Sequence, residues 1–338
     1  MEQKYLAGIL IVVFAAFLLG AYVFFIAPPP KSASAPLKVS MNAWTGFFPA
    51  FIAQEKGFFK KNGVDVQLTL KENTADVLAL YESGAVDGAY TVYPDAILGN
   101  LKGIKQIVVY VVDYSNTADV IIGDPTLNSL ADLRGKTVGI DGVNTFSHLF
   151  VLQSLEKAGL HEGDFLLQNV PASQVLAQLE SKNISAGHTY DPFRAEAVSK
   201  GYKTLGTAGD VRGIITDVLV FSPEAVKSRP KDVQAYIKSI SEATDFLRAN
   251  PQEAIGIISR DTNISVQDIQ AGFGGITMPN LEENAASMEP SDDLNSLYGS
   301  GNVISQFYMT SGQISKVPDF KTIVYPAFVQ NILSESKK

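Results

Sequence analysis

The stretch GAVDGAYTVYPD at residues 84–95 and its counterpart KNISAGHTYDPF at residues 182–193 decide the fold. Both end a short apolar run with the same residue types, namely Gly, Thr, Tyr, Asp and Pro. Each also follows an earlier apolar run at a similar distance, about 52 residues from position 39 to 91 and about 51 from position 138 to 189. This spacing favours one supersecondary unit used twice, although any two strand–helix–strand units share a general likeness.

Around these stretches, short β-rich runs alternate with helical patterns, which is typical of a parallel sheet covered on both faces. We expect strands over residues 37–41, 64–70, 88–91, 105–112, 119–122, 137–140, 165–170, 185–189 and 217–221. Residues 231–311 are mostly helical and offer no sheet of their own, so we expect this part to pack back on one of the two units. The sequence therefore predicts an α/β protein.

Composition excludes several functions. The 338 residues are 46% hydrophobic, enough for two domains with cores, and the net charge of −8 argues against a nucleic-acid partner. Cysteine is absent, which excludes disulfides, thiolate metal sites, cysteine nucleophiles and a lipid-modified N-terminal cysteine. The three histidines, His148, His161 and His188, have no metal-ligand spacing, and no phosphate-loop or hydrolase motif occurs. We therefore expect no cofactor, no metal site and no enzymatic activity.

The N-terminal segment predicts the compartment. Residues 5–27 form an unbroken apolar run of about 23 residues, enough to cross a bilayer and longer than the core of a usual secretory signal. We expect a cytoplasmic tail at 1–4, a transmembrane anchor at 5–27 and a Pro/Ser/Ala tether at 28–36. A secretory signal cleaved after Ser34 is the alternative, because Pro36 disfavours a cut after Ala35. The bulk of the chain is then periplasmic or extracellular.

Several segments together resemble the nitrate/sulfonate/taurine class of ABC-transporter substrate-binding proteins. They are AWTGFFPAFIAQEKGFFKKNGVDVQL at 43–68, LYESGAVDGAY at 80–90, VDYSNTADVII at 112–122, LADLRGKTVGI at 130–140, TDVLVF at 216–221, LEEN at 281–284 and GQISKVPDF at 312–320. Each segment alone is weak, but their order and spacing extend the resemblance from about residue 37 to the end.

This resemblance implies a two-lobed periplasmic-binding-protein fold with two crossover strands, which we map to 119–123 and 217–221. Lobe one would be 37–122 with 221–338, and lobe two 123–220. The implied partners are a small-molecule ligand and an ABC permease with its ATPase, and the protein would be monomeric. A sensor ectodomain for a membrane signalling partner is the alternative function, and an enzyme on the same fold is a third.

Ligands of open α/β sheets bind at the carboxyl ends of the strands, so the residues that follow strands are the candidates. The predicted ligand-binding residues are Asn42, Trp44, Thr45, Tyr93, Asp95, Asp113, Ser115, Asn144, Thr145, Phe146, Tyr190, Asp191 and Asp217. Asn144, Thr145 and Ser147 at a helix start could seat an anionic group on free backbone N–H groups, or could simply cap the helix.

Acidic and aromatic side chains dominate these candidates. The wider set of residues near the strand ends includes four carboxylates, Asp95, Asp113, Asp141 and Asp191, and no lysine. An amine-bearing or heteroaromatic ligand, stacked on an aromatic ring and bonded by an aspartate, therefore fits better than a bare inorganic anion. Among the ligands of the resembled family, taurine-like aminosulfonates and a thiamine pyrimidine precursor come nearest to this description.

Overall fold

A computed structural model describes residues 35–71, 74–143, 145–191 and 193–337. Within these ranges no helix is both long and apolar enough to span a membrane. The predicted tail at 1–4, the predicted anchor at 5–27 and nearly all of the predicted tether lie outside them, as does Asn144.

The first of two sheets has six strands in the order β11-β4-β10-β3-β1-β2. Strands β1 (Leu37–Asn42), β2 (Val66–Lys71) and β3 (Gly88–Val92) are parallel neighbours. Strand β10 (Thr216–Phe221) runs antiparallel between β3 and β4 (Ile107–Ser115), and β11 (Ile276–Thr277) pairs with the far side of β4.

The second sheet has five strands in the order β7-β6-β8-β5-β9. Strands β6 (Thr137–Ile140), β7 (Leu166–Asn169) and β8 (Ala186–Tyr190) are parallel neighbours. Strand β5 (Asp119–Gly123) runs antiparallel between β8 and β9 (Lys203–Thr207). Three parallel strands, an antiparallel strand and a fifth strand thus follow one another in both sheets, which agrees with one unit used twice.

Each sheet takes its antiparallel strand from the other half of the chain. Strand β5 follows β4 of the first sheet but pairs along its whole length in the second. Strand β10 follows β9 of the second sheet and pairs in the first. The predicted lobe boundaries at 122/123 and 220/221 therefore cut through strands, and strand pairing moves the changes of sheet to 116–118 and 208–215. Backbone N–H groups of Asn116, Thr117 and Ala118 all donate to Gly275 O at the first change.

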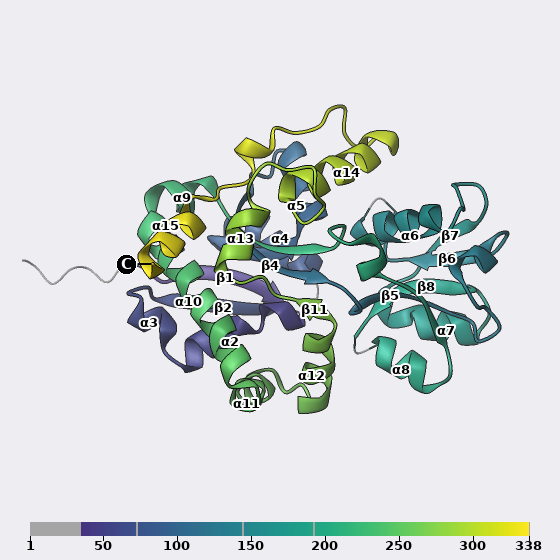
Figure 1. The fold of residues 1–338 in the computed structure, drawn as a ribbon, viewed down its shortest axis with the longest axis horizontal. Helices are drawn as coiled ribbons and strands as arrows, with labels where there is room; N and C mark the ends of the chain where they lie inside the picture. Colours follow the sequence, from purple (N-terminus) through teal and green to yellow (C-terminus); the bar gives the residue numbers. More distant parts are fainter. Residues whose placement is uncertain (1–34, 72–73, 144, 192, 338) are drawn as a thin grey trace, which may run out of the picture. The chain divides into compact units, whose positions relative to one another are not determined.

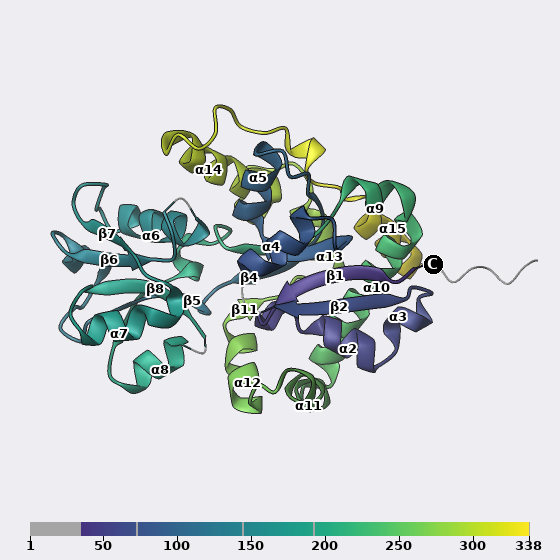
Figure 2. The ribbon, with the colours of Figure 1, turned by 180° about the vertical axis from the view of Figure 1, so that it is seen from behind.

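Helices cover both sheets. In Figures 1 and 2, α6 (Phe146–Lys157) lies on one side of the second sheet, and α7 (Val175–Glu180) with α8 (Phe193–Ser199) lies on the other. Around the first sheet, α5 (Tyr93–Leu101) and α14 (Leu297–Thr310) lie on the side opposite α2 (Pro49–Glu55) and α11 (Pro251–Thr262). Proline occupies the first or second position of α2 and α5, where its missing N–H and fixed φ are tolerated.

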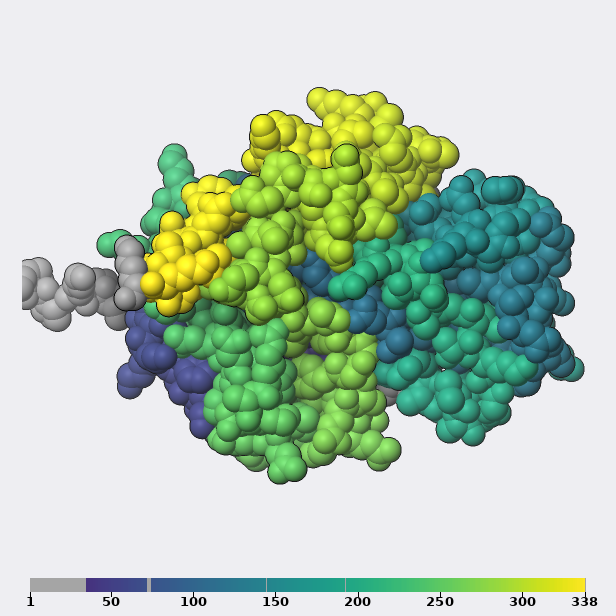
Figure 3. Space-filling view, viewed as in Figure 1, coloured from purple at the N-terminus to yellow at the C-terminus, as the bar shows by residue number. Residues whose placement is uncertain are grey.

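The C-terminal helices pack on the first sheet. This agrees with the prediction that residues 231–311, which have no sheet of their own, pack back on one of the two units. Figure 3 shows these residues, in light green and yellow, at the left and centre of the view, while most of the teal part at the right is left uncovered. The buried Asn284 of α13 (Leu281–Ser287) accepts from Val111 N–H at 3.1 Å and donates to Val111 O at 2.5 Å. An amide that satisfies both backbone groups of one residue fixes the helix on β4.

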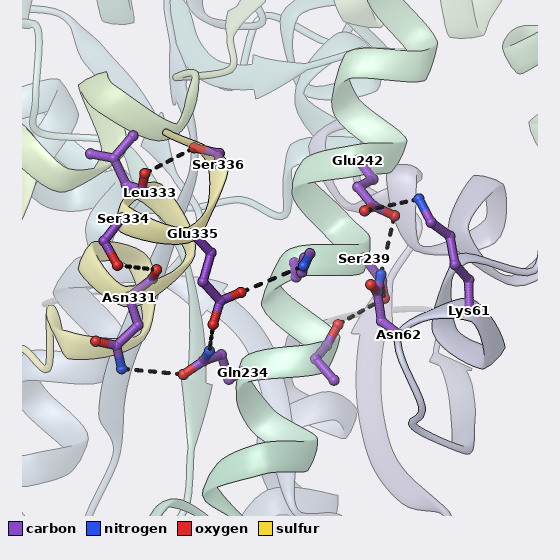
Figure 4. Close-up of polar contacts among 12 residues, drawn as sticks. Lys61, Asn62, Gln234, Ser239, Glu242, Asn331, Leu333, Ser334, Glu335 and Ser336 are labelled. Carbon is purple, nitrogen blue, oxygen red and sulfur yellow. Dashed lines mark hydrogen bonds and ion pairs between the residues drawn. The ribbon is translucent and has the colours of Figure 1, made fainter. Parts of the chain in front are cut away.

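The long helix α10 (Pro230–Ala249) joins two other helices to this unit (Figure 4). Asn62, which follows α3 (Phe58–Lys61), donates to Ser239 at 3.0 Å on one side of α10. On the other side, Glu335 of α15 (Ala327–Ser336) accepts from Gln234 at 3.3 Å. Inside, the hydroxyls of Tyr90 and Tyr236 lie 3.0 Å apart, so α10 is also bonded to the buried β3.

Candidate functional site

A cavity of about 630 Å³ lies where the carboxyl ends of the parallel strands of the two sheets meet. Residues of both sheets line it, which is the arrangement expected of a ligand site at strand ends. The lining residues are Asn42, Ala43, Trp44, Phe47, Thr74, Ala75, Leu78, Tyr90, Thr91, Val92, Asp95, Asp119, Asp141, Thr145, Phe146, Pro171, Ala172, Ser173, Tyr190, Asp191, Phe193, Ile215 and Asp217.

Eight predicted site residues lie in this wall. They are Asn42, Trp44, Asp95, Thr145, Phe146, Tyr190, Asp191 and Asp217. Four others do not: Thr45, Tyr93, Asp113 and Ser115.

The four exceptions have structural roles nearby. Tyr93 is fully buried, and its hydroxyl donates to Leu297 O at 2.9 Å, so it belongs to the core. Ser115 Oγ accepts from the backbone N–H of Asp119 at 3.1 Å. Asp113 is fully buried behind Trp44, whose indole donates to it at 3.1 Å. Thr45 packs so closely on α12 (Val266–Gly274) that a Cβ on Gly272 would come within 2.2 Å of its hydroxyl.

Aromatic rings form one part of the cavity wall. Trp44 follows a strand of the first sheet, and its ring contacts that of Tyr190 in the second sheet. The two rings pack edge to face with centroids 6.1 Å apart, and the rings of Tyr190 and Phe193 lie 5.9 Å apart. Such rings offer faces for a planar ligand or a cation. The Trp44–Tyr190 contact also joins the two units directly across the cavity.

Carboxylates form the other part. Asp95, Asp119, Asp141, Asp191 and Asp217 all line the cavity, and no lysine or arginine is among the described residues that do. Asp191 is matched by a bidentate ion pair with Arg194, at 2.9 and 2.7 Å. The wall as a whole is therefore strongly acidic and suits a cation or a group rich in N–H donors.

Asp113 and Asp217 form a hydrogen-bonded pair of buried carboxyl groups. They are register partners on β4 and β10. Burial raises the pKa of Asp113 to about 7, against the opposing effect of hydrogen bonds from Trp44 and Asp217. Burial, followed by the negative charges of Asp113 and Asp119, raises the pKa of Asp217 well above its usual range. Two carboxyl groups can share a hydrogen bond only if one is protonated, so the pair retains a proton that isolated carboxylates would release.

A third acid behaves similarly. Burial raises the pKa of Asp95 to about 6, with the charge of Lys102 opposing this in part. Asp95 stands in the first turn of α5, where a helix favours a negative charge, yet desolvation prevails.

Two buried oxygen atoms in the wall have no partner among the described residues. They are Asn42 Oδ1 and Thr91 Oγ1. Because buried polar atoms are nearly always bonded, both are natural contacts for a ligand. Thr145 differs, since its hydroxyl donates within its own loop toward Asp141 O and Gly142 O, both at 2.9 Å. It also caps α6 by accepting from His148 N–H, so the capping interpretation holds for it.

Asp119 was missed by the prediction. The predicted site residues follow strands, whereas Asp119 begins one. Because β5 is antiparallel to its neighbour β8, its first residue lies at the edge where the parallel strands end. The antiparallel direction of β5 could not be read from the sequence pattern.

Comparison with known proteins gives a family and a fold. The sequence pattern of the NMT1-like family matches residues 30–259. A Brucella abortus protein named as a binding protein is 26% identical over 282 residues, which cover 80% of this chain and 83% of that protein. The riboflavin-binding protein RibY of Chloroflexus aurantiacus is 23% identical over 270 residues, 78% of this chain and 74% of that one.

An enzyme is among the relatives. A 4-amino-5-hydroxymethyl-2-methylpyrimidine phosphate synthase of Saccharomyces cerevisiae is 24% identical over 222 residues, 61% of this chain and 64% of the enzyme. The relatives of this chain therefore include proteins named for binding and proteins named for catalysis.

Two solved structures share the architecture. The ligand-binding component of an ABC-type import system from Staphylococcus aureus has a TM-score of 0.72 and 17% identity, covering 88% of this chain and 99% of that one. The periplasmic aliphatic sulphonate-binding protein SsuA of Escherichia coli has a TM-score of 0.67 and 17% identity, covering 86% and 92%. The predicted periplasmic-binding-protein fold and the resemblance to the sulfonate class are confirmed; at these identities the likeness establishes the fold.

Proposed function

Because the chain belongs to the NMT1-like family, we propose that it is the solute-binding component of an ABC importer. It would capture a small organic solute between two α/β lobes outside the cytoplasm and deliver it to a permease driven by an ATPase. The single observation that carries this proposal is the cavity of about 630 Å³, which is lined by residues from the strand ends of both sheets. The two sheets share the same arrangement of three parallel strands and one antiparallel strand. That volume lies within the range of small-molecule sites.

We further propose that the solute is a heteroaromatic or amine-bearing molecule. Trp44, Tyr190 and Phe193 supply ring faces, and the carboxylates beside them accept N–H groups or balance a positive charge. A sulfonate without an amine would place its negative charge among these carboxylates, with no cation in the described wall to meet it. A pyrimidine precursor, an aminosulfonate or a flavin-like ring system satisfies the wall better, and the names of two relatives concern ring compounds of this kind.

The experiment uses three benzyl probes of different charge: benzylamine, benzyl alcohol and phenylmethanesulfonate. Calorimetric titration at pH 7.5 should give the tightest binding for benzylamine and the weakest for the sulfonate. A preference for the sulfonate would reject the proposed ligand class. Native mass spectrometry of protein purified without refolding tests the binding role separately, since a solute receptor is expected to retain or accept a single small molecule per chain.

We also infer binding rather than catalysis. The synthase among the relatives matches only 61% of this chain. The described part of the acidic wall contains no histidine or lysine that could activate one of its hydroxyl groups as a nucleophile. One of these hydroxyl groups, that of Thr145, is committed to a helix cap. Incubation of any captured solute with the protein should return it unchanged, as measured by mass spectrometry.

The N-terminal segment completes the proposal. We infer that residues 5–27 anchor the protein in the membrane and that residues 28–36 tether the lobes near the permease, which would raise their local concentration there. Fractionation of cells that express the full chain, with an intact-mass measurement, should find the whole chain in the membrane fraction. A product in the soluble periplasmic fraction that begins near Ala35 would show a cleaved signal instead.

A further inference from the structure

Three polar side chains from three elements form a relay behind the cavity wall. Asp119 begins β5, His188 lies in β8, and Ser147 lies in the first turn of α6. His188 Nε2 lies 2.9 Å from Asp119 Oδ1, and His188 Nδ1 lies 2.8 Å from Ser147 Oγ. The side chains of His188 and Ser147 have no solvent exposure, and Asp119 is 3% exposed.

The hydrogen atoms of this relay can be assigned by counting donors. The backbone N–H of Asp141 donates to Ser147 Oγ at 2.8 Å, which leaves the serine one hydrogen to give. Its partner in the described structure is His188 Nδ1, which must then be an acceptor. The imidazole hydrogen therefore sits on Nε2 and is donated to Asp119. Every hydrogen-bonding atom of His188 and Ser147 is satisfied by this one arrangement.

Aromatic packing holds the imidazole in place. The rings of Phe146 and Phe150 meet it edge to face, with centroids 5.7 and 5.2 Å away. Tyr190 of the cavity wall lies 6.2 Å from it. The histidine cannot turn without disturbing these rings, so the oxygen of Asp119 that it holds is fixed.

The hydrogen-bonded order Asp–His–Ser is that of a hydrolytic triad, but here the aspartate and not the serine faces the cavity. In a hydrolase the serine faces the substrate. Here Ser147 is sealed in the core and receives a backbone hydrogen bond, whereas Asp119 lines the cavity. The relay therefore presents a carboxylate and cannot present a nucleophile.

Asp119 also differs from two other acids of the wall, Asp191 and Asp217. Asp191 is already matched by Arg194, and Asp217 shares a hydrogen bond with Asp113. Asp119 has one oxygen bonded to His188 and no further side-chain hydrogen bond within the described residues. Its second oxygen is therefore available to accept a hydrogen bond from a bound molecule.

We propose that Asp119 is the residue that recognises a cationic or N–H-donating group of the solute, and that His188 and Ser147 are positioning residues that aim it. This inference rests on the proposed solute-binding function and adds to it the residue that decides the ligand's charge.

The first arm of the test needs no ligand. Nitrogen-15 NMR of histidine-labelled protein should show His188 as the Nε2–H tautomer at pH 7.5, with Nδ1 unprotonated. In Ser147→Ala the Nδ1 resonance should move because its hydrogen bond is lost. Detection of the Nδ1–H tautomer in the wild-type chain would overturn the relay, whatever the protein transports.

The second arm measures binding of benzylamine and benzyl alcohol by calorimetry. Asp119→Asn should lower the affinity for benzylamine by about 10- to 100-fold, the range for a hydrogen bond to a charged group, and change that for the alcohol little. His188→Phe keeps the ring but loses the donor, and should reduce the benzylamine preference in the same direction. His188→Gln, whose amide nitrogen can donate to Asp119, should restore part of it.

The exposed His161→Gln is the matched control and should leave both affinities unchanged. An unaltered ratio of amine to alcohol affinity in Asp119→Asn would overturn the recognition role. If wild-type protein itself shows no preference for the amine, recognition by Asp119 also fails; a single solute retained in native mass spectrometry would still uphold the binding function, so the two failures are distinguishable.

Discussion

Replacement of Asp217 by Asn should change how the free energy of unfolding depends on pH. Asp217 and Asp113 share a hydrogen bond in a buried site, and the pKa of both carboxyl groups is raised by that burial. Asparagine has nearly the same shape and can donate to Asp113 through its amide, so the variant keeps the hydrogen bond without needing a proton.

The sign follows from which state holds the proton. A carboxyl group whose pKa is raised in the folded state stabilises the fold fully only when the pH is below its ordinary pKa of 3.8. This contribution to the free energy of unfolding is lost as the pH rises to the pKa of the folded state, which is about 7 for Asp113. Each pH unit in this window lowers the free energy of unfolding by about 1.4 kcal/mol per proton retained. Over roughly 3 units one proton is worth at most about 4 kcal/mol. The variant lacks the Asp217 share of this loss and should become more stable relative to wild type as the pH rises from 4 to 8.

Three other carboxyl groups affect the free energy of unfolding in a different pH window. Hydrogen bonds lower the pKa of Asp124, Asp132 and Asp164, so their contributions are lost only as the pH falls below the ordinary range. Burial raises the pKa of Asp95 into the same window, but Asp95 is present in both chains. The difference between the variant and wild type in urea unfolding at intervals from pH 4 to 8 therefore reports the buried pair. The exposed Asp292→Asn is the control and should give a curve parallel to wild type. Parallel curves for Asp217→Asn as well would refute a proton shared between Asp113 and Asp217.

Two further changes test the aromatic wall. Trp44→Ala removes the contact with Tyr190 and should weaken benzylamine binding by about 1 to 3 kcal/mol with little change in the melting temperature; a much lower melting temperature with unchanged affinity would assign the ring to the core. Gly46→Ala would place a Cβ 1.7 Å from Asp113 Oδ2, so it should displace that carboxyl group and destabilise the fold by about 1 to 3 kcal/mol. It should also shift the fluorescence emission of Trp44, the single tryptophan of the chain. An unshifted emission spectrum would contradict the close approach of Gly46 to Asp113.

The sequence could predict which strand ends supply the site but not which side chains point into it. Asn42 and Tyr190 end β1 and β8, and both line the cavity as the strand-end rule predicts. Tyr93 and Asp95 were predicted together, yet they are the first and third residues of α5. Two positions along a helix differ by about 200°, so one side chain faces the cavity and the other faces α14. Which of the two would be buried depends on helices that arrive about 200 residues later in the chain, beyond any local pattern.

The antiparallel strands β5 and β10 each bring an aspartate to the cavity, and the two aspartates have different partners. Asp119 of β5 lies opposite Tyr190 of β8, and Asp217 of β10 lies opposite Val92 of β3, so the two acids hold equivalent places in equivalent sheets. Each strand comes from the other half of the chain and brings an aspartate to the edge where the parallel strands end. The side chains next to each aspartate then give it a different protonation behaviour.

Asp119 meets the Nε2–H of His188, a donor, whereas Asp217 meets Asp113, another acid. A donor holds a carboxylate ready for a positive group, and an acid forces its partner to keep a proton. From one duplicated position the fold thus obtains a carboxylate fixed for recognition and a second that must release a proton before it can balance a charge. A cationic solute that reached both would consequently bind more tightly as the pH rises, and the Asn variants at 119 and 217 separate the two contributions.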